Sequence, residues 1–168
     1  GKYRPALLAA TMLGQAKTIY QAEIDAAAET VDFLRFNVQH MSLLSQYSPY
    51  STEEAENSMK LRPMEGFWAA VSPFNFTAIG IHLAAAPAFM GNCVLWKPSD
   101  TAMLSNYIGF QALREAGLPA GVINFVPTHG PDFGDVITNS ADLAVINFTV
   151  SVATFRTLSK QVGQNIDQ

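Results

Sequence analysis

The sequence predicts an α/β fold: a Rossmann-like, mostly parallel sheet with helices on both faces, preceded by an N-terminal helical segment. From residue 66 onward, short apolar runs alternate with helix-length segments, which is the pattern of consecutive βα units. Most of these runs are apolar at nearly every position rather than at alternate positions, as expected for strands that are covered on both faces. The sequence therefore favours parallel strands joined by helical crossovers.

Residues 1–45 form the expected N-terminal helical segment, because residues 6–45 are rich in alanine and contain no proline. We expect Gly14, a weak helix former, to divide this region into two helices. Apolar residues recur at steps of three and four and form one stripe, which we expect to pack on a neighbouring surface. The stripe consists of Ile24, Ala27, Ala28, Val31, Leu34, Val38 and Met41.

A polar, acidic connector is expected over residues 46–65, followed by an NAD-binding α/β domain over 66–168 that is incomplete. The predicted strands cover 66–72, 93–96, 122–126 and 143–148. The predicted helices cover 76–90, 101–116, 131–138 and 151–162. Unusual turns follow the strands, at Ser72-Pro73, at Lys97-Pro98 and within 127–130 and 149–151. Because ligands of such sheets bind where the strands end, we expect the functional site at this edge.

Composition excludes several classes of partner. The net charge of −4 and the scattered Lys and Arg residues argue against nucleic acid. Residues 66–96 carry no charge, but Pro73 and Pro87 interrupt them, so a buried strand, helix and strand explain this run better than a membrane span. One cysteine, Cys93, excludes an internal disulfide, and three histidines far apart in sequence predict no metal site.

Asn75 and Lys97 are the residues most suited to chemistry. The Asn75 amide could stabilise an oxyanion or simply cap the helix that follows. Lys97 ends a strongly apolar strand, and Pro98 keeps it extended, so its cation suits ribose hydroxyls or phosphate. Ser99, with Asp100, could contribute to that site or cap the next helix.

Two further turns could contact a nucleotide. Gly130 and Gly134 flank a turn at the start of a short helix, without the spacing of a dinucleotide fingerprint. Ser151 could cap the last helix and offer its hydroxyl and the nearby amides to a pyrophosphate. His82 lies in an apolar helix, where we expect it to be a packed core residue.

Several motifs resemble the aldehyde dehydrogenase superfamily across essentially the whole chain. Residues 72–79 and 21–29 are most similar to the mitochondrial branch that oxidises glutamate γ-semialdehyde to glutamate with NAD in proline breakdown. The motifs that carry the resemblance are Glu65-Gly66-Phe67, 70–79, Gly91-Asn92, 97–101, 114–119 and Ile146-Asn147-Phe148-Thr149.

The resemblance implies NAD as cofactor, a small-molecule aldehyde as substrate and a mitochondrial matrix location, although the chain shows no targeting segment. It implies that Asn75 is the oxyanion-stabilising asparagine, that Lys97 and Ser99 lie where the family holds the adenine-side ribose, and that Ser151 lies near the pyrophosphate. We also expect five other residues to contact the cofactor: Ser72, Pro73, Phe74, Gly130 and Gly134. The resemblance covers only an internal part of such enzymes. It places the nucleophilic cysteine and the general-base glutamate beyond Gln168, so we expect the chain alone to be inactive.

The chain departs from the family at Val150, which replaces a glycine. A β-branched residue there obstructs both a positive φ and close approach of the backbone to phosphate, so we expect weakened NAD binding. Ile81, His82 and Ala85 replace small or amide residues. Cys93, with apolar neighbours, is expected to be buried and inert.

These departures leave an alternative function open, that of a non-catalytic interaction or scaffold protein derived from the same fold. Its exposed apolar faces would be covered by a protein partner or by a second copy of the chain.

Overall fold

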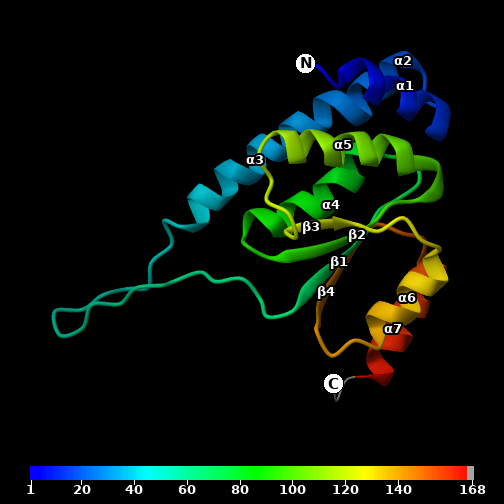
Figure 1. The fold of residues 1–168 in the computed structure, drawn as a ribbon. Coiled ribbons are helices and arrows are strands. Elements are labelled where there is room, and N and C mark those ends of the chain that lie inside the picture. The colour runs from blue at the N-terminus through cyan, green and yellow to red at the C-terminus, as the bar shows by residue number, and fades with distance from the viewer. Residues whose placement is uncertain (166–168) are drawn as a thin grey trace.

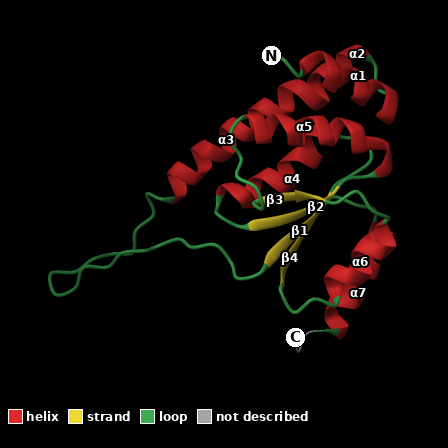
Figure 2. Ribbon diagram, in the orientation of Figure 1, coloured by secondary structure: helices red, strands yellow, loops and turns green. Residues whose placement is uncertain are grey.

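A four-stranded parallel sheet lies between two helical layers in the computed structural model, which describes residues 1–165 (Figures 1 and 2). The strands occur in the order β3-β2-β1-β4. Their bounds are Phe67–Val71 for β1, Cys93–Lys97 for β2, Ile123–Phe125 for β3 and Leu143–Phe148 for β4. The predicted fold class is confirmed, and each predicted strand is present.

Helices cover both faces of this sheet. One layer contains α4 (Thr77–Phe89) and α5 (Met103–Glu115). A short 3-10 turn, η2 (Asp100–Ala102), comes directly before α5. The opposite layer contains α6 (Gly130–Thr138) and α7 (Val152–Gln164) (Figure 1). The chain thus runs from β1 through β2 to β3, and then returns to the other side of β1 to form β4. This reversal is a topological switch point, where open α/β sheets bind their ligands.

Side chains that alternate along the strands fill two separate cores. On the α4 side, the fully buried Trp96 packs with Ala70, Val94 and Ile123 of the strands and with Ile81 of α4. On the other side, Ala69 packs against Phe133 and Ile137 of α6. Each strand is therefore held from both faces, which explains why its sequence is apolar almost throughout.

The N-terminal helices form an outer layer over α4 and α5 (Figure 1). They are α1 (Arg4–Gln15), α2 (Ile19–Ala22), a π-helical segment η1 (Glu23–Ala28) and α3 (Glu29–Leu44). The predicted break at Gly14 is wrong. The chain turns at Ala16, which adopts the left-handed conformation with φ of 53°, and α2 then starts at a capping box formed by Thr18 and Gln21.

Gly14 serves a different purpose within α1. A Cβ atom built on Gly14 would lie 2.1 Å from the carbonyl oxygen of Thr101, which belongs to η2. The glycine therefore lets α1 approach the backbone at the start of α5.

The expected docking of the apolar stripe is also wrong within this chain. Ile24, Val31, Val38 and Met41 are exposed, whereas Ala22 and Ala26 are fully buried. Periodicity identifies an apolar face of a helix, but it does not say what covers that face. In addition, the wider turn of η1 breaks the phase of a pattern counted at 3.6 residues per turn.

His82 lies at the contact between α3 and α4, half-buried and away from the carboxyl edge of the sheet. Its Nδ1 is 3.0 Å from Nδ2 of Asn37, and its ring lies 4.6 Å from that of Phe33, centroid to centroid. Burial lowers the pKa of His82, which favours the neutral form of the ring. His82 therefore packs between helices, as expected of a residue that does not bind a ligand.

The segment 45–66 links α3 to β1 without a helix or a strand and extends away from the helical layers (Figure 1). Its side chains are exposed throughout. A hydrogen bond from the Asn57 amide to the Tyr50 carbonyl, at 2.7 Å, joins the two arms of this loop.

Replacing Gly14 with alanine should separate α1 from η2 and destabilise the chain by about 1–3 kcal/mol, the usual cost of forcing extra atoms into a packed contact. Chemical denaturation measures this difference. Gly163→Ala in α7 is the matched control, because its new methyl group meets no atom within 4 Å. The control should stabilise the helix by about 0.5–1 kcal/mol. Equal effects of the two substitutions would contradict the proposed contact.

Candidate functional site

The register of the sheet brings three turns to one level. Val71, the last residue of β1, pairs with Lys97 of β2 on one side and with Phe148 of β4 on the other. Backbone hydrogen bonds continue one step further, from Ser72 N to Lys97 O at 3.1 Å and from Thr149 N to Val71 O at 3.3 Å. The turns after β1, β2 and β4 therefore start side by side at the carboxyl edge.

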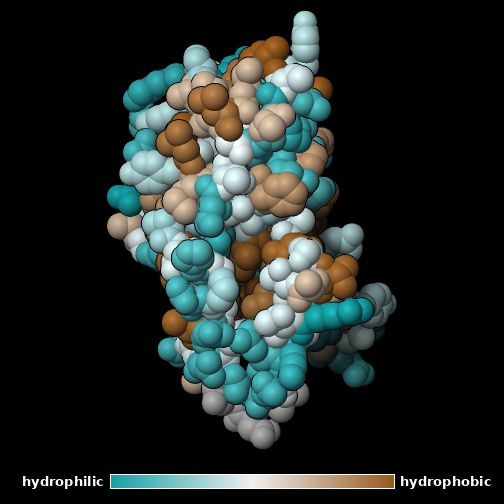
Figure 3. Space-filling view, turned by 90° about the vertical axis from the view of Figure 1, so that its right-hand side faces the viewer, coloured by the Kyte–Doolittle hydropathy of each residue, from teal (hydrophilic) through white to brown (hydrophobic). Residues whose placement is uncertain are grey.

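Two adjoining cavities occupy this edge. The first, of about 480 Å³, is lined by Lys97 and by residues of α6 and α7. The second, of about 460 Å³, is lined by the turn Pro73-Phe74-Asn75 and by Ser151. Four residues line both cavities and join them into one cleft: Ser72, Ser99, Val150 and Thr154. Seen from the side at which the strands end, hydrophobic surface lies at mid-height and hydrophilic surface predominates below it (Figure 3).

Lys97 supplies the cation of the first cavity. The residue is only 7% exposed, and its Nζ lies 3.8 Å from Oδ1 of Asp100, beyond the distance of a direct hydrogen bond. Over the described residues, no protein acceptor lies within hydrogen-bond distance of this ammonium group. Its N–H donors are thus available to a ligand in the cavity.

Ser72 has a structural part in this cleft. Its hydroxyl accepts a hydrogen bond from Nε1 of Trp96 at 2.6 Å and donates one to the carbonyl of Gly80 at 3.3 Å. The hydroxyl thus links β2 and α4 to the turn after β1, and it donates its only proton to Gly80. The hydroxyl of Ser72 therefore has no proton left to donate to a cofactor, and it could contact one only as an acceptor.

Asn75 does not cap α4. The cap position is held by Phe76, and no side chain caps this helix terminus. Asn75 is half-buried and lines the second cavity, next to Phe74, whose side chain is 66% exposed. The capping interpretation is therefore wrong, and the amide of Asn75 is free to donate a hydrogen bond into the cleft.

The two serines differ in their local roles. Ser151 caps α7 by accepting a hydrogen bond from Thr154 N at 3.3 Å, and it also lines the second cavity. Ser99 occupies the cap position of η2, but its side chain makes no capping bond. Of the two interpretations for Ser99, capping by its side chain is therefore wrong.

The structure separates the two candidate glycines. Gly130 begins α6 and lines the first cavity. Gly134 lies further along the helix, where an added Cβ would be 3.5 Å from Cδ2 of Leu158. That distance is an ordinary van der Waals contact, so Gly134 faces α7, and it does not line either cavity.

Val150 lines both cavities with a backbone of ordinary conformation. Among the described non-glycine residues, only Ala16 has a positive φ. Val150 therefore does not adopt the positive φ that a glycine would permit at this position. The steric argument remains. Val150 lines the cleft, where its side chain would keep a ligand phosphate away from the protein backbone.

The prediction that Cys93 is buried is wrong. Cys93 is exposed, and its Sγ lies 3.1 Å from the carbonyl oxygen of Gly121. It is the first residue of β2, whereas Lys97 is the last, so the strand separates the thiol from the cleft by about 13 Å. The apolar neighbours of Cys93 correctly indicate a strand. Its exposure, however, depends on its position at the amino edge of the sheet, opposite the cleft.

Sequence reasoning missed the face of α7 that closes the first cavity. Ala153, Thr154, Thr157, Leu158 and Gln161 recur at three- and four-residue steps and all line it. This spacing marks one face of a helix, and the mixture of apolar and hydroxyl side chains on it was the available signal.

The described residues, 1–165, hold no group of three or more His, Cys, Asp or Glu side chains arranged to bind a metal ion. Within the same range, every helix is too short or too polar to traverse a lipid bilayer.

Comparison with known proteins places this cleft in context. Residues 2–168 match the model of the aldehyde dehydrogenase family. The mitochondrial Δ1-pyrroline-5-carboxylate dehydrogenases of Bos taurus and Homo sapiens are 59% and 58% identical over all 168 residues. The chain spans about 30% of the length of these curated relatives.

Solved structures agree with the sequence relatives. The crystal structure of the Δ1-pyrroline-5-carboxylate dehydrogenase of Mycobacterium tuberculosis superposes with a TM-score of 0.97 at 48% identity, over 99% of this chain and 31% of that one. A structure of the same enzyme bound with NAD gives the same TM-score. A succinate-semialdehyde dehydrogenase from Burkholderia pseudomallei, at 23% identity and a TM-score of 0.83, shares the fold.

Replacing Ser72 with alanine should leave Nε1 of the fully buried Trp96 without an acceptor. An unsatisfied buried donor costs about 1–3 kcal/mol, so the free energy of unfolding should fall by that amount in urea titrations. Ser99→Ala is the matched control in the same cleft, because the side chain of Ser99 makes no capping bond. A loss of stability no larger than that of the control would contradict the role assigned to Ser72.

Proposed function

We propose that this chain, which belongs to the aldehyde dehydrogenase family, supplies the NAD-binding cleft and the oxyanion-stabilising asparagine of an enzyme that oxidises an aldehyde. The similarity to Δ1-pyrroline-5-carboxylate dehydrogenases supports glutamate γ-semialdehyde as the substrate and glutamate as the product. The relatives named as mitochondrial support a location in the mitochondrial matrix.

The observation that carries the proposal is the meeting of a buried ammonium group and two helix N-termini in one cleft. Lys97 lines the first cavity, and the first residues of α6 and α7 border it. The first turn of a helix has backbone N–H groups without intrahelical acceptors, and its dipole favours anions. The cleft therefore offers hydrogen-bond donors to a diphosphate and to ribose hydroxyls.

The same cleft provides apolar surface for a flat ring. Pro131, Phe133 and Leu158 lie on its α6 and α7 walls, close enough to Lys97 to share the first cavity. A volume of about 480 Å³ falls in the range typical of small-molecule sites. The residues present therefore fit a nucleotide, with the base between the helices and the ribose toward Lys97 and Ser99.

Asn75 accounts for the chemical part of the proposal. Its amide lines the second cavity, which joins the first through Ser99 and Val150. When NAD is bound, its nicotinamide ring accepts the hydride of the aldehyde. Asn75 would hold the developing oxyanion of the thiohemiacetal by donating an N–H, a type of contact worth about 3–4 kcal/mol. The attacking thiol must come from residues other than Cys93, which lies at the opposite rim.

NAD should raise the thermal unfolding midpoint of the chain, because a ligand that binds only the folded state stabilises it. At a hundredfold excess over Kd the gain should be about 2.7 kcal/mol. Lys97→Met should weaken binding about 10-fold to 100-fold, since hydrogen bonds to charged groups are worth about 1.5–3 kcal/mol. Lys60→Met, in the exposed loop, should leave NAD affinity unchanged. The absence of any shift at millimolar NAD would count against the cofactor site and favour a non-catalytic interaction protein.

Val150→Gly should strengthen NAD binding up to about tenfold, or about 1.4 kcal/mol, by opening the space that both cavities share. Isothermal titration calorimetry provides the dissociation constants. Val136→Gly on α6 is the matched control, because Val136 is 72% exposed and lines neither cavity. An unaltered affinity in Val150→Gly would refute the steric account of this turn.

A further inference from the structure

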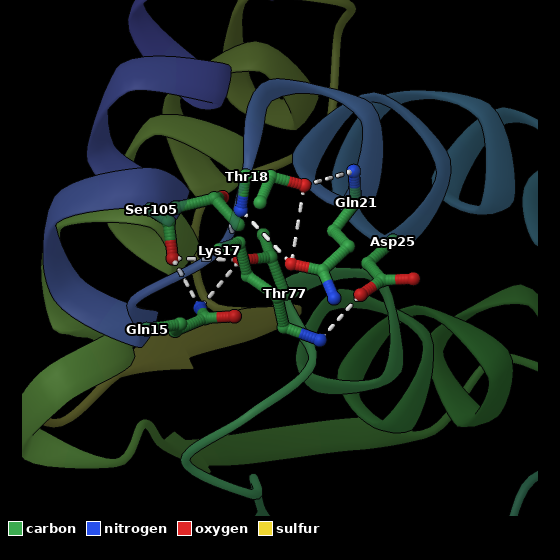
Figure 4. A network of polar contacts seen from close by, with 8 residues as sticks. Gln15, Lys17, Thr18, Gln21, Asp25, Thr77 and Ser105 are labelled. Atoms are coloured by element: carbon green, nitrogen blue, oxygen red, sulfur yellow. Dashed lines mark hydrogen bonds and ion pairs between the residues drawn. The ribbon is translucent and has the colours of Figure 1, made fainter.

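A partly buried polar cluster beside the Asn75 turn lines neither cavity of the cleft. It contains Lys17 and Asp25, whose side chains form an ion pair and are only 14% and 13% exposed. Figure 4 shows the Lys17 side chain reaching from the turn after α1 toward Asp25. Placing two charges in such a confined position is costly unless other groups stabilise them.

The main additional partner of this pair is Phe76. Nζ of Lys17 lies 4.0 Å from the centroid of the Phe76 ring, well within the range of a cation–π interaction. Phe76 directly follows Asn75 and holds the cap position of α4, with φ of −138° and ψ of 107°. Since Phe76 makes no side-chain capping hydrogen bond, the contact with Lys17 bears directly on the conformation of the Asn75 turn.

The backbone around Lys17 is well fixed. Ala16 adopts the left-handed conformation just before it. Thr18 just after it forms reciprocal hydrogen bonds with Gln21, at 2.9 Å from Thr18 N to Gln21 Oε1 and 3.3 Å from Gln21 N to Thr18 Oγ1 (Figure 4). A long flexible side chain thus starts from a defined point, which makes it suitable for positioning a neighbour.

Hydrogen bonds from α1 anchor the next residue, Thr77. Its Oγ1 lies 2.9 Å from Oγ1 of Thr11, accepts from Nε2 of Gln15 at 2.7 Å and donates to Oγ of Ser105 at 2.9 Å. Figure 4 shows Gln15, Thr77 and Ser105 pointing toward one another. The chain is therefore held on the α4 side of Asn75, while Phe74 on the other side is largely exposed.

We propose that Lys17 is a positioning residue, which holds Phe76 through its ammonium group and thereby fixes the orientation of the Asn75 amide toward the cleft. Asp25 holds the ammonium group in place. Glu29 lies one turn further along and has a buried Oε2 without a hydrogen-bond partner. Burial and the negative charge of Asp25 raise the pKa of Glu29, and the positive charge of Lys17 opposes this shift. Lys17 therefore reduces the repulsion between the carboxylates of Asp25 and Glu29.

The first test needs no substitution. The ε-methylene protons of Lys17 should resonate upfield of those of Lys60 in a proton–carbon correlation spectrum, because the ring current of Phe76 shields groups above its face. Phe76→Leu should return the Lys17 signals to the position of the Lys60 signals. Coincident signals in the unsubstituted chain would overturn the proposal.

The second test reads out the orientation of Asn75. Lys17→Met should shift the side-chain amide signals of Asn75 in a proton–nitrogen spectrum and leave those of Asn139, at the far end of α6, in place. Lys17→Arg, which keeps a cation capable of stacking on the ring, should restore the original Asn75 signals. Asn75 signals that do not move in Lys17→Met would overturn the proposal.

If Lys17→Met does not fold, Phe76→Leu carries the same comparison, because it keeps the ion pair with Asp25 while removing the ring. The Asn75 signals should then move in Phe76→Leu, and fixed signals would again refute the proposal. The inference rests on the proposed role of Asn75, but its tests use no NAD. A failure of the NAD titration and a failure of the Lys17 contact are therefore separate results.

Discussion

Parallel pairing of β1 with both β2 and β4 is the constraint on which the rest of the structure depends. The register sets Val71 opposite both Lys97 and Phe148, so the following residues leave the sheet at the same level. The helix α7 starts after β4, and α6 starts after β3, which pairs in parallel with β2. The N-termini of both helices therefore lie at the same edge as the Lys97 ammonium group. A shift of one residue in the pairing of β1 with β2 would move the Lys97 side chain to the opposite face of the sheet and dismantle the cleft.

The residues around the cleft divide into those that build it and those that remain available. Ser72 joins Trp96 to Gly80, and Ser151 caps α7. Lys97 and Asn75 are different, because each lines a cavity with donors that the protein does not satisfy. Side chains with unused donors in a formed cleft are the ones from which ligand contacts are expected.

The strands and their turns could be predicted from sequence because apolar runs bounded by Gly, Pro and Ser have few other solutions in a folded chain. The positions that could not be predicted depend on distant neighbours. A lone glycine such as Gly14 predicts a helix break, but its role here comes from the nearby Thr101 carbonyl. The apolar neighbours of Cys93 predict burial, but its place at the start of β2 exposes it. The stripe on α3 has helical spacing, yet spacing contains no information about what lies opposite.

The order of the strands also affects how the cleft assembles. One helix separates β1 from β2, whereas β4 must return to β1 across two intervening strands and three helices. Closing the longer loop costs more chain entropy, so the β1–β2 half can form well before β4 arrives. The part of the cleft around Lys97 is thus formed by segments close together in sequence, whereas the part around Val150 is not. Only when the last strand docks could a nucleotide contact both parts of the cleft.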